Sequence, residues 1–326
     1  MNGMASVKVN VDNFVRAETD RMFTSIQQLG GGVVNRLHHN RGPSPLDDQR
    51  VIRTNRDTHY SSAVVDISQS ATLTVPDAGE RYLSVMVVNQ DHYINEIIHE
   101  SGEHELTVDR FDTDYVAIAA RILADPNDPV DIAAVNDLQD QFRLTAAAGR
   151  PFVPTGYDTA SLDATREALL SLARGIDGFA RSFGTRDQVD PVRHLIGTAA
   201  GWGGLPDAEA FYLNVEPHLP VGDYELTVGD VPVDGFWSIS VYNAAGYFVP
   251  NDRGVVSVNN ITADRNDDAT ITVRFGGGDQ PNTIPIMDGW NYAVRLYRPR
   301  REILDQTWTF PTVTPSASAH LAARGL

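Results

Sequence analysis

The densest group of side chains able to do chemistry lies at residues 55–60, directly before a run of β-branched residues. Arg56 could hold an anionic substrate group, because its planar guanidinium matches a carboxylate or a phosphate. Asp57 and His59 could act as base and orienter, since histidine is the side chain most easily poised near neutral pH. The candidate catalytic residues are therefore Asp57, His59 and Tyr60, and the candidate substrate-binding residues begin with Asn55 and Arg56.

A structural role for the same group is the competing hypothesis. Alternate side chains of an extended segment point to opposite faces, which separates Arg56 from Asp57. If both are buried, they would anchor loops through hydrogen bonds and a domain-locking ion pair, as polar networks in β-folds do. The sequence leaves a catalytic site and a scaffold open as interpretations of residues 55–60.

Three histidines, His92, His99 and His104, are close in the sequence and suggest a metal site. A two-residue turn at Ser101-Gly102 would place His99 opposite His104 in a hairpin, with two glutamates beside them. A zinc site in a protein needs three or four converging ligands, and acidic side chains at an exposed tip are also typical of an acidic surface. We therefore predict no bound metal.

The C-terminal half has polar residues in predicted turns and aromatic residues in predicted strands. The segment Asn251-Asp252-Arg253 follows a proline, at a turn where polar groups can face a cleft. The aromatic residues alternate along the strands, so most of them are expected in the core. A second set of candidate substrate-binding residues comprises Asn243, Arg253, Asn282 and Asp288.

The familiar cofactor and nucleophile motifs are missing from the sequence. No phosphate-binding loop, dinucleotide fingerprint, nucleophile elbow or zinc-protease helix occurs in a credible context. Gly276-Gly277-Gly278 lacks the lysine and the following helix of a phosphate-binding loop. With no cysteine in the chain, disulfides, thiolate metal sites and a cysteine nucleophile are excluded. The sequence accordingly predicts no cofactor.

The elements that must position these residues are mostly strands. Helical periodicity is confined mainly to residues 13–29, 128–147 and 158–184, and the first of these segments has a candidate N-cap in Asn13. Around residues 51–120 and 222–311, short runs rich in β-branched residues alternate with turn residues. Strand should therefore exceed helix.

This pattern predicts a mainly β fold with two β-sandwich or jelly-roll-like domains, an N-terminal helix and a helical connector. The glycine-rich stretch at residues 201–206 is typical of a boundary or a tight turn. The expected domains are an N-terminal β-sandwich with its leading helix at 1–125, the connector at 126–200 and a C-terminal jelly-roll-like domain at 201–326.

The formal net charge of −17 limits the classes of partner. Such a surface repels nucleic acid and anionic membranes, so we expect neither as a partner. No apolar stretch reaches the roughly 20 residues that span a bilayer, and the first residues lack the apolar run of a signal peptide. We expect a cytoplasmic protein with a small-molecule ligand. The oligomeric state stays open, with a homo-oligomer as one possibility. Lys8 is the sole lysine and aspartate predominates, which fits adaptation to high salt as well as a GC-rich genome.

Two parts of the chain resemble known families. Residues 34–67, with the core Asn-Arg-Asp-Thr-His-Tyr at 55–60, are similar to the start of domain-of-unknown-function (DUF) family 1254. Residues 232–254 and 288–311 resemble DUF family 1214, its usual C-terminal companion. Thr283 departs from the pattern, because family members tend to carry a larger residue there. The resemblance implies two β-sandwich or jelly-roll domains joined by helices, and it implies no activity.

Three functions therefore compete. The first is a cofactor-independent acid–base enzyme, a hydrolase or lyase, acting on a small polar or anionic molecule between two β domains. The second is a non-catalytic protein that binds a small molecule or carbohydrate, as concave jelly rolls with exposed aromatic residues do. The third is a structural or interaction protein. Shifted pKa values in a pocket would favour the enzyme. A solvent-facing Trp or Tyr would favour the binding protein, and buried ion pairs would favour the structural protein.

Overall fold

The computed structural model describes residues 6–47, 49, 53–176 and 178–316, and the chain divides into two compact units. Unit 1 contains residues 1–41, 59–123 and 130–207, whereas unit 2 contains residues 42–58, 124–129 and 208–326. Residues 48 and 50–52, inside the block that resembles DUF family 1254, lie outside the described residues. The chain thus leaves unit 1 for unit 2 and returns to it twice.

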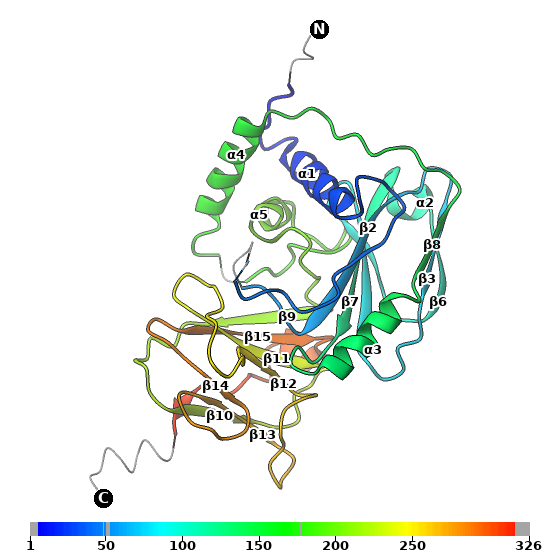
Figure 1. Cartoon of the computed structure of the whole chain (residues 1–326). Coiled ribbons are helices and arrows are strands. Elements are labelled where there is room, and N and C mark those ends of the chain that lie inside the picture. The colour runs from blue at the N-terminus through cyan, green and yellow to red at the C-terminus, as the bar shows by residue number, and fades with distance from the viewer. Residues whose placement is uncertain (1–5, 48, 50–52, 177, 317–326) are drawn as a thin grey trace, which may run out of the picture. The chain divides into compact units, whose positions relative to one another are not determined.

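Unit 1 contains two sheets and a group of helices (Figure 1). The five-stranded sheet has the order β1 (His38–His39), β2 (Thr58–Asp66), β7 (Tyr115–Leu123), β4 (Leu83–Asn89) and β5 (Ile94–Ile98). The three-stranded sheet has the order β6 (Gly102–Leu106), β3 (Ala71–Val75) and β8 (Arg143–Ala146). The helices are α1 (Phe14–Leu29), α2 (Val108–Phe111), α3 (Pro129–Gln139), α4 (Thr159–Leu172) and α5 (Pro191–Gly201).

Helices α1, α4 and α5 share one apolar core in unit 1. Its buried residues are Val9, Phe14, Ala17, Leu162, Leu169, Ile196 and Ala199. The buried face of α1 includes the polar residues Glu18, Thr19 and Asp20, whereas Leu29 is 50% exposed. All three helices belong to unit 1.

Three local predictions in this unit are wrong. The helix expected over 128–147 ends at Gln139, because the following residues form β8 and pair with β3. The hairpin expected at Ser101-Gly102 does not form, because β5 pairs with β4 whereas β6 pairs with β3 in the other sheet. The helix expected over 158–184 ends at Leu172, and α5 was not predicted.

Unit 2 is a sandwich of two four-stranded sheets (Figure 1). One sheet has the order β14 (Thr283–Ile284), β13 (Ile271–Phe275), β10 (Tyr224–Val228) and β16 (Thr314–Pro315). The other has the order β12 (Ser257–Asn259), β11 (Trp237–Tyr242), β15 (Asn291–Tyr297) and β9 (Ala210–Val215), and α6 (Arg301–Leu304) follows β15. A single apolar cluster draws residues from both sheets, which explains the period-two pattern of the sequence.

The mainly β fold is confirmed, with more strand than helix in the described residues. Most of the aromatic residues expected in the core are buried, among them Trp237, Tyr242, Trp290, Tyr292 and Tyr297. Within the ranges described above, no helix has the length and apolar character needed to cross a membrane.

Candidate functional site

The two neighbouring strands β11 and β15 of unit 2 are buried on both faces. On β11, Trp237, Ile239 and Val241 face the apolar core, whereas the alternate residues Ser238 and Ser240 belong to the opposite face. All residues of β11 and β15 are buried. The second face is polar, so its groups need hydrogen-bond partners away from water.

Arg295 stands at the centre of this polar face and is 4% exposed. Its Nη1 donates to Ser240 Oγ at 3.0 Å, and its Nη2 donates to Tyr242 Oη at 2.8 Å and to the carbonyl oxygen of Arg53 at 2.7 Å. Burial lowers its pKa, but the nearby Tyr242, Tyr297 and Asp57 together raise that pKa above its usual range. Arg295 is therefore a buried and permanently charged cation.

Asp57 supplies the negative charge of the network. Its Oδ2 accepts a 2.6 Å hydrogen bond from Ser238 Oγ, and Ser238 lies directly opposite Arg295 across the two strands. Its Oδ1 has no hydrogen-bond partner among the described residues. Burial raises the pKa of Asp57, and Arg295, Ser238 and Arg56 oppose that rise. The carboxyl group thus holds a proton more readily than an exposed aspartate does.

The residues just before Asp57 are also held by unit 2. Asn55 donates to Tyr297 Oη at 3.0 Å and accepts the backbone N–H of Asp57 at 2.8 Å. Arg56 is 9% exposed and donates from Nη1 to the carbonyl oxygen of Ser44. Burial lowers the pKa of Arg56, with Asp57 opposing this effect. Both side chains fix the path of the segment, as the structural hypothesis expects.

His59 and Tyr60 lie in unit 1, so the structure does not place the three predicted catalytic residues in one described site. His59 is 1% exposed, and neither of its ring nitrogens has a hydrogen-bond partner in the described part of the chain. Burial lowers its pKa, with Asp131 raising and Arg81 lowering it. The guanidinium of Arg121 lies 5.5 Å from the Tyr60 ring centroid, a cation–π contact.

The second set of predicted site residues is spread over turns of unit 2. Asn243 accepts from the backbone of Ala245 and Tyr247, and Asn282, at φ +57°, bonds both backbone groups of Asp264. Arg253 donates to the carbonyl oxygen of Gly278, and Asp288 is exposed. Asn243 thus closes its own turn, whereas Arg253 and Asn282 connect separate loops.

The histidines weighed as metal ligands have separate partners. His99 Nδ1 lies 3.0 Å from the carbonyl oxygen of Leu83, and His104 Nε2 lies 3.0 Å from that of Glu100. No group of three or more metal-ligating side chains occurs within the described ranges.

His92 takes part in an aromatic stack that the sequence did not predict. Its ring stacks on His194 at 5.4 Å and on Trp202 at 5.2 Å between centroids, and Tyr93 stacks on His194 at 4.8 Å. His92 Nε2 accepts the backbone N–H of Gly203, and its Nδ1 contacts Thr198 Oγ1 at 2.8 Å. Burial and His194 hold the pKa of His92 well below its usual value. The stack is a satisfied part of the interior of unit 1.

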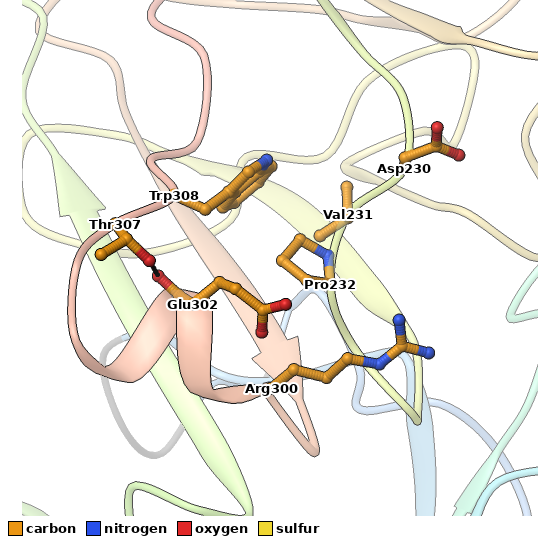
Figure 2. Close-up of a pocket in the computed structure, with 7 residues that line it drawn as sticks. All are labelled: Asp230, Val231, Pro232, Arg300, Glu302, Thr307 and Trp308. Atoms are coloured by element: carbon orange, nitrogen blue, oxygen red, sulfur yellow. Dashed lines mark hydrogen bonds between the residues drawn. The ribbon is translucent and has the colours of Figure 1, made fainter.

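A pocket of about 640 Å³ opens beside α6 in unit 2 (Figure 2). Figure 2 shows the Trp308 ring facing Val231 and Pro232, with the Glu302 carboxylate reaching into the space near Pro232. The full lining comprises Asp230, Val231, Pro232, Arg300, Glu302, Thr307 and Trp308. This pocket was not predicted from the sequence, although the aromatic Trp308 next to a charged turn was a visible signal.

Comparison with protein families matches two regions of the chain. Residues 34–99 match "Protein of unknown function (DUF1254)", and residues 215–301 match "Protein of unknown function (DUF1214)". The chain resembles both families, as predicted. The DUF1254 match contains Asp57, and the DUF1214 match contains Ser238 and Arg295, so the buried network joins the two matched regions. Comparison with curated proteins gave no significant match.

Two solved structures resemble the chain along most of its length. The VPA0106 protein from Vibrio parahaemolyticus has a TM-score of 0.75 at 17% identity, covering 94% of this chain and 97% of its own. An uncharacterised protein from Burkholderia cenocepacia has a TM-score of 0.52 at 13% identity, covering 94% and 88% of the two chains. At these identities the likeness shows the fold alone.

Proposed function

We propose that this protein binds an uncharged, hydroxyl-rich small molecule of the size of a sugar in the Trp308 pocket of unit 2. The observation that carries the proposal is the half-buried Trp308 ring in an open pocket of about 640 Å³. Small-molecule sites in proteins commonly measure about 300–1,000 Å³ and combine apolar walls with a few polar groups.

The lining matches the two kinds of surface that a sugar presents. Trp308 is held edge-to-face on Phe310, with ring centroids 5.9 Å apart, and its backbone N–H donates to the carbonyl oxygen of Glu302. Its ring and Pro232 offer an apolar platform for C–H groups. The carboxylates of Asp230 and Glu302 accept hydrogen bonds from hydroxyl groups, and the same two charges repel an anionic ligand.

Arg300 adds donors without reversing this preference. Its Nε donates to Asp234 Oδ1 at 2.7 Å, so an adjacent carboxylate compensates its charge. A neutral ligand can therefore use the remaining guanidinium N–H groups. A small-molecule partner and a cytoplasmic location are both parts of this proposal.

Isothermal titration with a panel of neutral mono- and disaccharides tests the proposal. We expect saturable binding by the wild type, binding about tenfold weaker or worse in Trp308→Ala, and near wild-type binding in Trp308→Phe. Trp308→Phe is the matched control because it keeps an aromatic ring at the platform. If no neutral sugar binds, or if Trp308→Ala binds as well as the wild type, the proposal is wrong.

The acid–base enzyme is a second candidate, favoured by Asp57. A buried carboxyl group with a raised pKa and an unpartnered Oδ1 is the kind of group that exchanges protons in hydrolysis or elimination. At 1% exposure, its carboxyl reaches a substrate only if the surrounding chain moves. The substitutions at Asp57 described below separate this function from a scaffold.

A further inference from the structure

A second pocket, of about 290 Å³, lies in unit 1 where α1 ends and β1 begins. Four of its eight lining residues are basic and none is acidic. The basic residues are Arg36, His38, His39 and Arg41, and the others are Leu37 and the residues at the end of α1, Leu29, Gly30 and Gly31. Basic residues, histidine included, make up 35 of the 326 residues, so composition alone would place about one of them among eight. The lining therefore offers no carboxylate to repel an anion, although the chain has a net charge of −17.

Arg36 is the cation available to a ligand. It is exposed, and its side chain makes no ion pair or hydrogen bond within the described residues. Its Nη1 lies 3.3 Å from the point that a Cβ atom on Gly31 would occupy, so the glycine leaves room for the guanidinium. A guanidinium without a carboxylate partner keeps its full charge and all its N–H donors for a ligand, and Arg36 lines this pocket.

The other basic groups of the pocket are held in place by neighbours in unit 1. Arg41 donates to Asp140 Oδ1 at 2.5 Å and to the carbonyl oxygen of Asn136 at 3.0 Å. His39 Nδ1 contacts Ser61 Oγ at 2.8 Å, and His38 Nε2 contacts Asn40 Oδ1 at 3.1 Å. Each histidine uses one ring nitrogen in this way, which leaves the second one for a ligand.

The C-terminal end of α1 would ordinarily disfavour an anion. Here the carbonyl oxygens of Ile26, Gln27 and Gln28 already accept backbone hydrogen bonds from the three glycines at 30–32. This capping occupies three of the last carbonyls of α1. Asp140 compensates the charge of Arg41, and burial and Arg41 lower the pKa of His39, so Arg36 supplies the uncompensated positive charge of the pocket.

We propose that this pocket binds a small oxyanion, a phosphate or carboxylate group, with Arg36 as its principal partner. The planar guanidinium can hold two oxygens of such a group at once, with the histidines completing the shell. This site is independent of the sugar site, because it lies in the other unit and shares no residue with it.

Titration calorimetry on the full chain tests the proposal with inorganic phosphate and with acetate, at an ionic strength held constant with sodium chloride. The variants are Arg36→Met, which keeps most of the side-chain bulk, and Arg174→Met, an exposed arginine of the same unit outside the pocket. We expect saturable phosphate or acetate binding by the wild type and by Arg174→Met, and binding at least about tenfold weaker in Arg36→Met.

Each outcome decides the proposal. Binding of phosphate alone, of acetate alone or of both supports it and identifies the group, provided that Arg36→Met loses the binding. The proposal is overturned if the wild type binds neither phosphate nor acetate saturably, or if Arg36→Met and Arg174→Met bind the anion equally well. The melting temperature of Arg36→Met without added anion, expected to match that of Arg174→Met, shows that a loss of binding is not a loss of folding.

Discussion

At the scale of single residues, Asp57 and Arg295 are buried in unit 2, and the charge of each shifts the pKa of the other. Burying two charges is costly, and the interior recovers that cost only where further hydrogen bonds complete the pair. Arg295 has such bonds to Ser240, Tyr242 and a backbone carbonyl, whereas Asp57 has one side-chain bond, to Ser238. The cation is thus better satisfied than the anion, which agrees with the raised pKa of Asp57.

The partners of the motif differ in what their removal should cost. We expect Arg295→Met to lower the free energy of unfolding by about 3–5 kcal/mol, because it strands the Asp57 charge and three acceptors. Arg56→Met should lower the free energy of unfolding by about 1–3 kcal/mol, because the variant loses mainly the hydrogen bond to Ser44. Urea unfolding of both variants measures the two values. A smaller loss for Arg295→Met than for Arg56→Met would contradict the assignment of Arg295 as the partner of Asp57.

Asp57→Asn separates the scaffold from the enzyme. If Asp57 is catalytic, the variant keeps most of its stability and loses about a hundredfold to ten-thousandfold in rate. If Asp57 is structural, the variant is strongly destabilised, and no activity is found in the wild type. Melting temperature and a screen for hydrolysis or elimination of small polar substrates give the two readouts.

The sequence could predict part of this network and not the rest. The concentration of polar residues at 55–60 was visible, and the scaffold hypothesis placed buried hydrogen bonds at Arg56 and Asp57. Both side chains are buried and hydrogen-bonded, to Ser44 and Ser238. Ser238 and Arg295 were not predicted, because their strands alternate in the same way as strands with a solvated face. Only the pairing of residues 181 positions apart shows that this face is covered.

At the scale of elements, helix α5 shows what single-sequence periodicity misses. Its start carries the standard signals, since Asp190 accepts the N–H groups of Val192 and Arg193 and Pro191 holds the first position. The helix was not predicted because its glycines and small residues are also typical of turns. The helix predicted at 128–147 failed for the opposite reason, because helical spacing continued into residues whose partner strand β3 lies far back in the sequence.

Gly197 allows α5 to approach the segment around Ser182. A Cβ atom at Gly197 would lie 2.7 Å from Ser182 Cβ and 3.3 Å from Phe183 Cε1. Gly197→Ala should gain about 1 kcal/mol in helix propensity and lose about 1–3 kcal/mol to overpacking, so we expect a lower melting temperature. The double variant Gly197→Ala with Ser182→Gly should recover much of that loss. A higher melting temperature for Gly197→Ala alone would show that the contact is easily relaxed.

At the scale of the whole molecule, the surplus of acidic residues dominates. Surface ion pairs such as Arg300 with Asp234 compensate part of it, but exposed pairs contribute little to stability. The mainly β character and the two β-rich halves followed from period-two patterning. The boundaries of the two units did not follow from that pattern, because residues 42–58 lie in the first half of the sequence but belong to unit 2, most of which comes after residue 207.

We predict that the melting temperature is preserved or raised between low and molar sodium chloride. Screening relieves the repulsion among surplus carboxylates, and this gain outweighs the weakening of surface ion pairs. Scanning calorimetry at several salt concentrations measures the trend. A steady fall in melting temperature with added salt would contradict the hypothesis of adaptation to high salt.

The placement of residues 42–58 in unit 2 also affects the order of events during synthesis. Asp57 leaves the ribosome long before its partner Ser238, which is 181 residues later. At ordinary translation rates of about 5–20 residues per second, that interval is about 10–40 s. During this time the polar groups of the segment, which are buried in the folded chain, remain in water. The strands of unit 1 that follow it in the sequence are synthesised in the same interval. Unit 2 can therefore be completed only after nearly the whole chain has been made, and a nascent chain halted before residue 238 would expose this segment to chaperones and proteases.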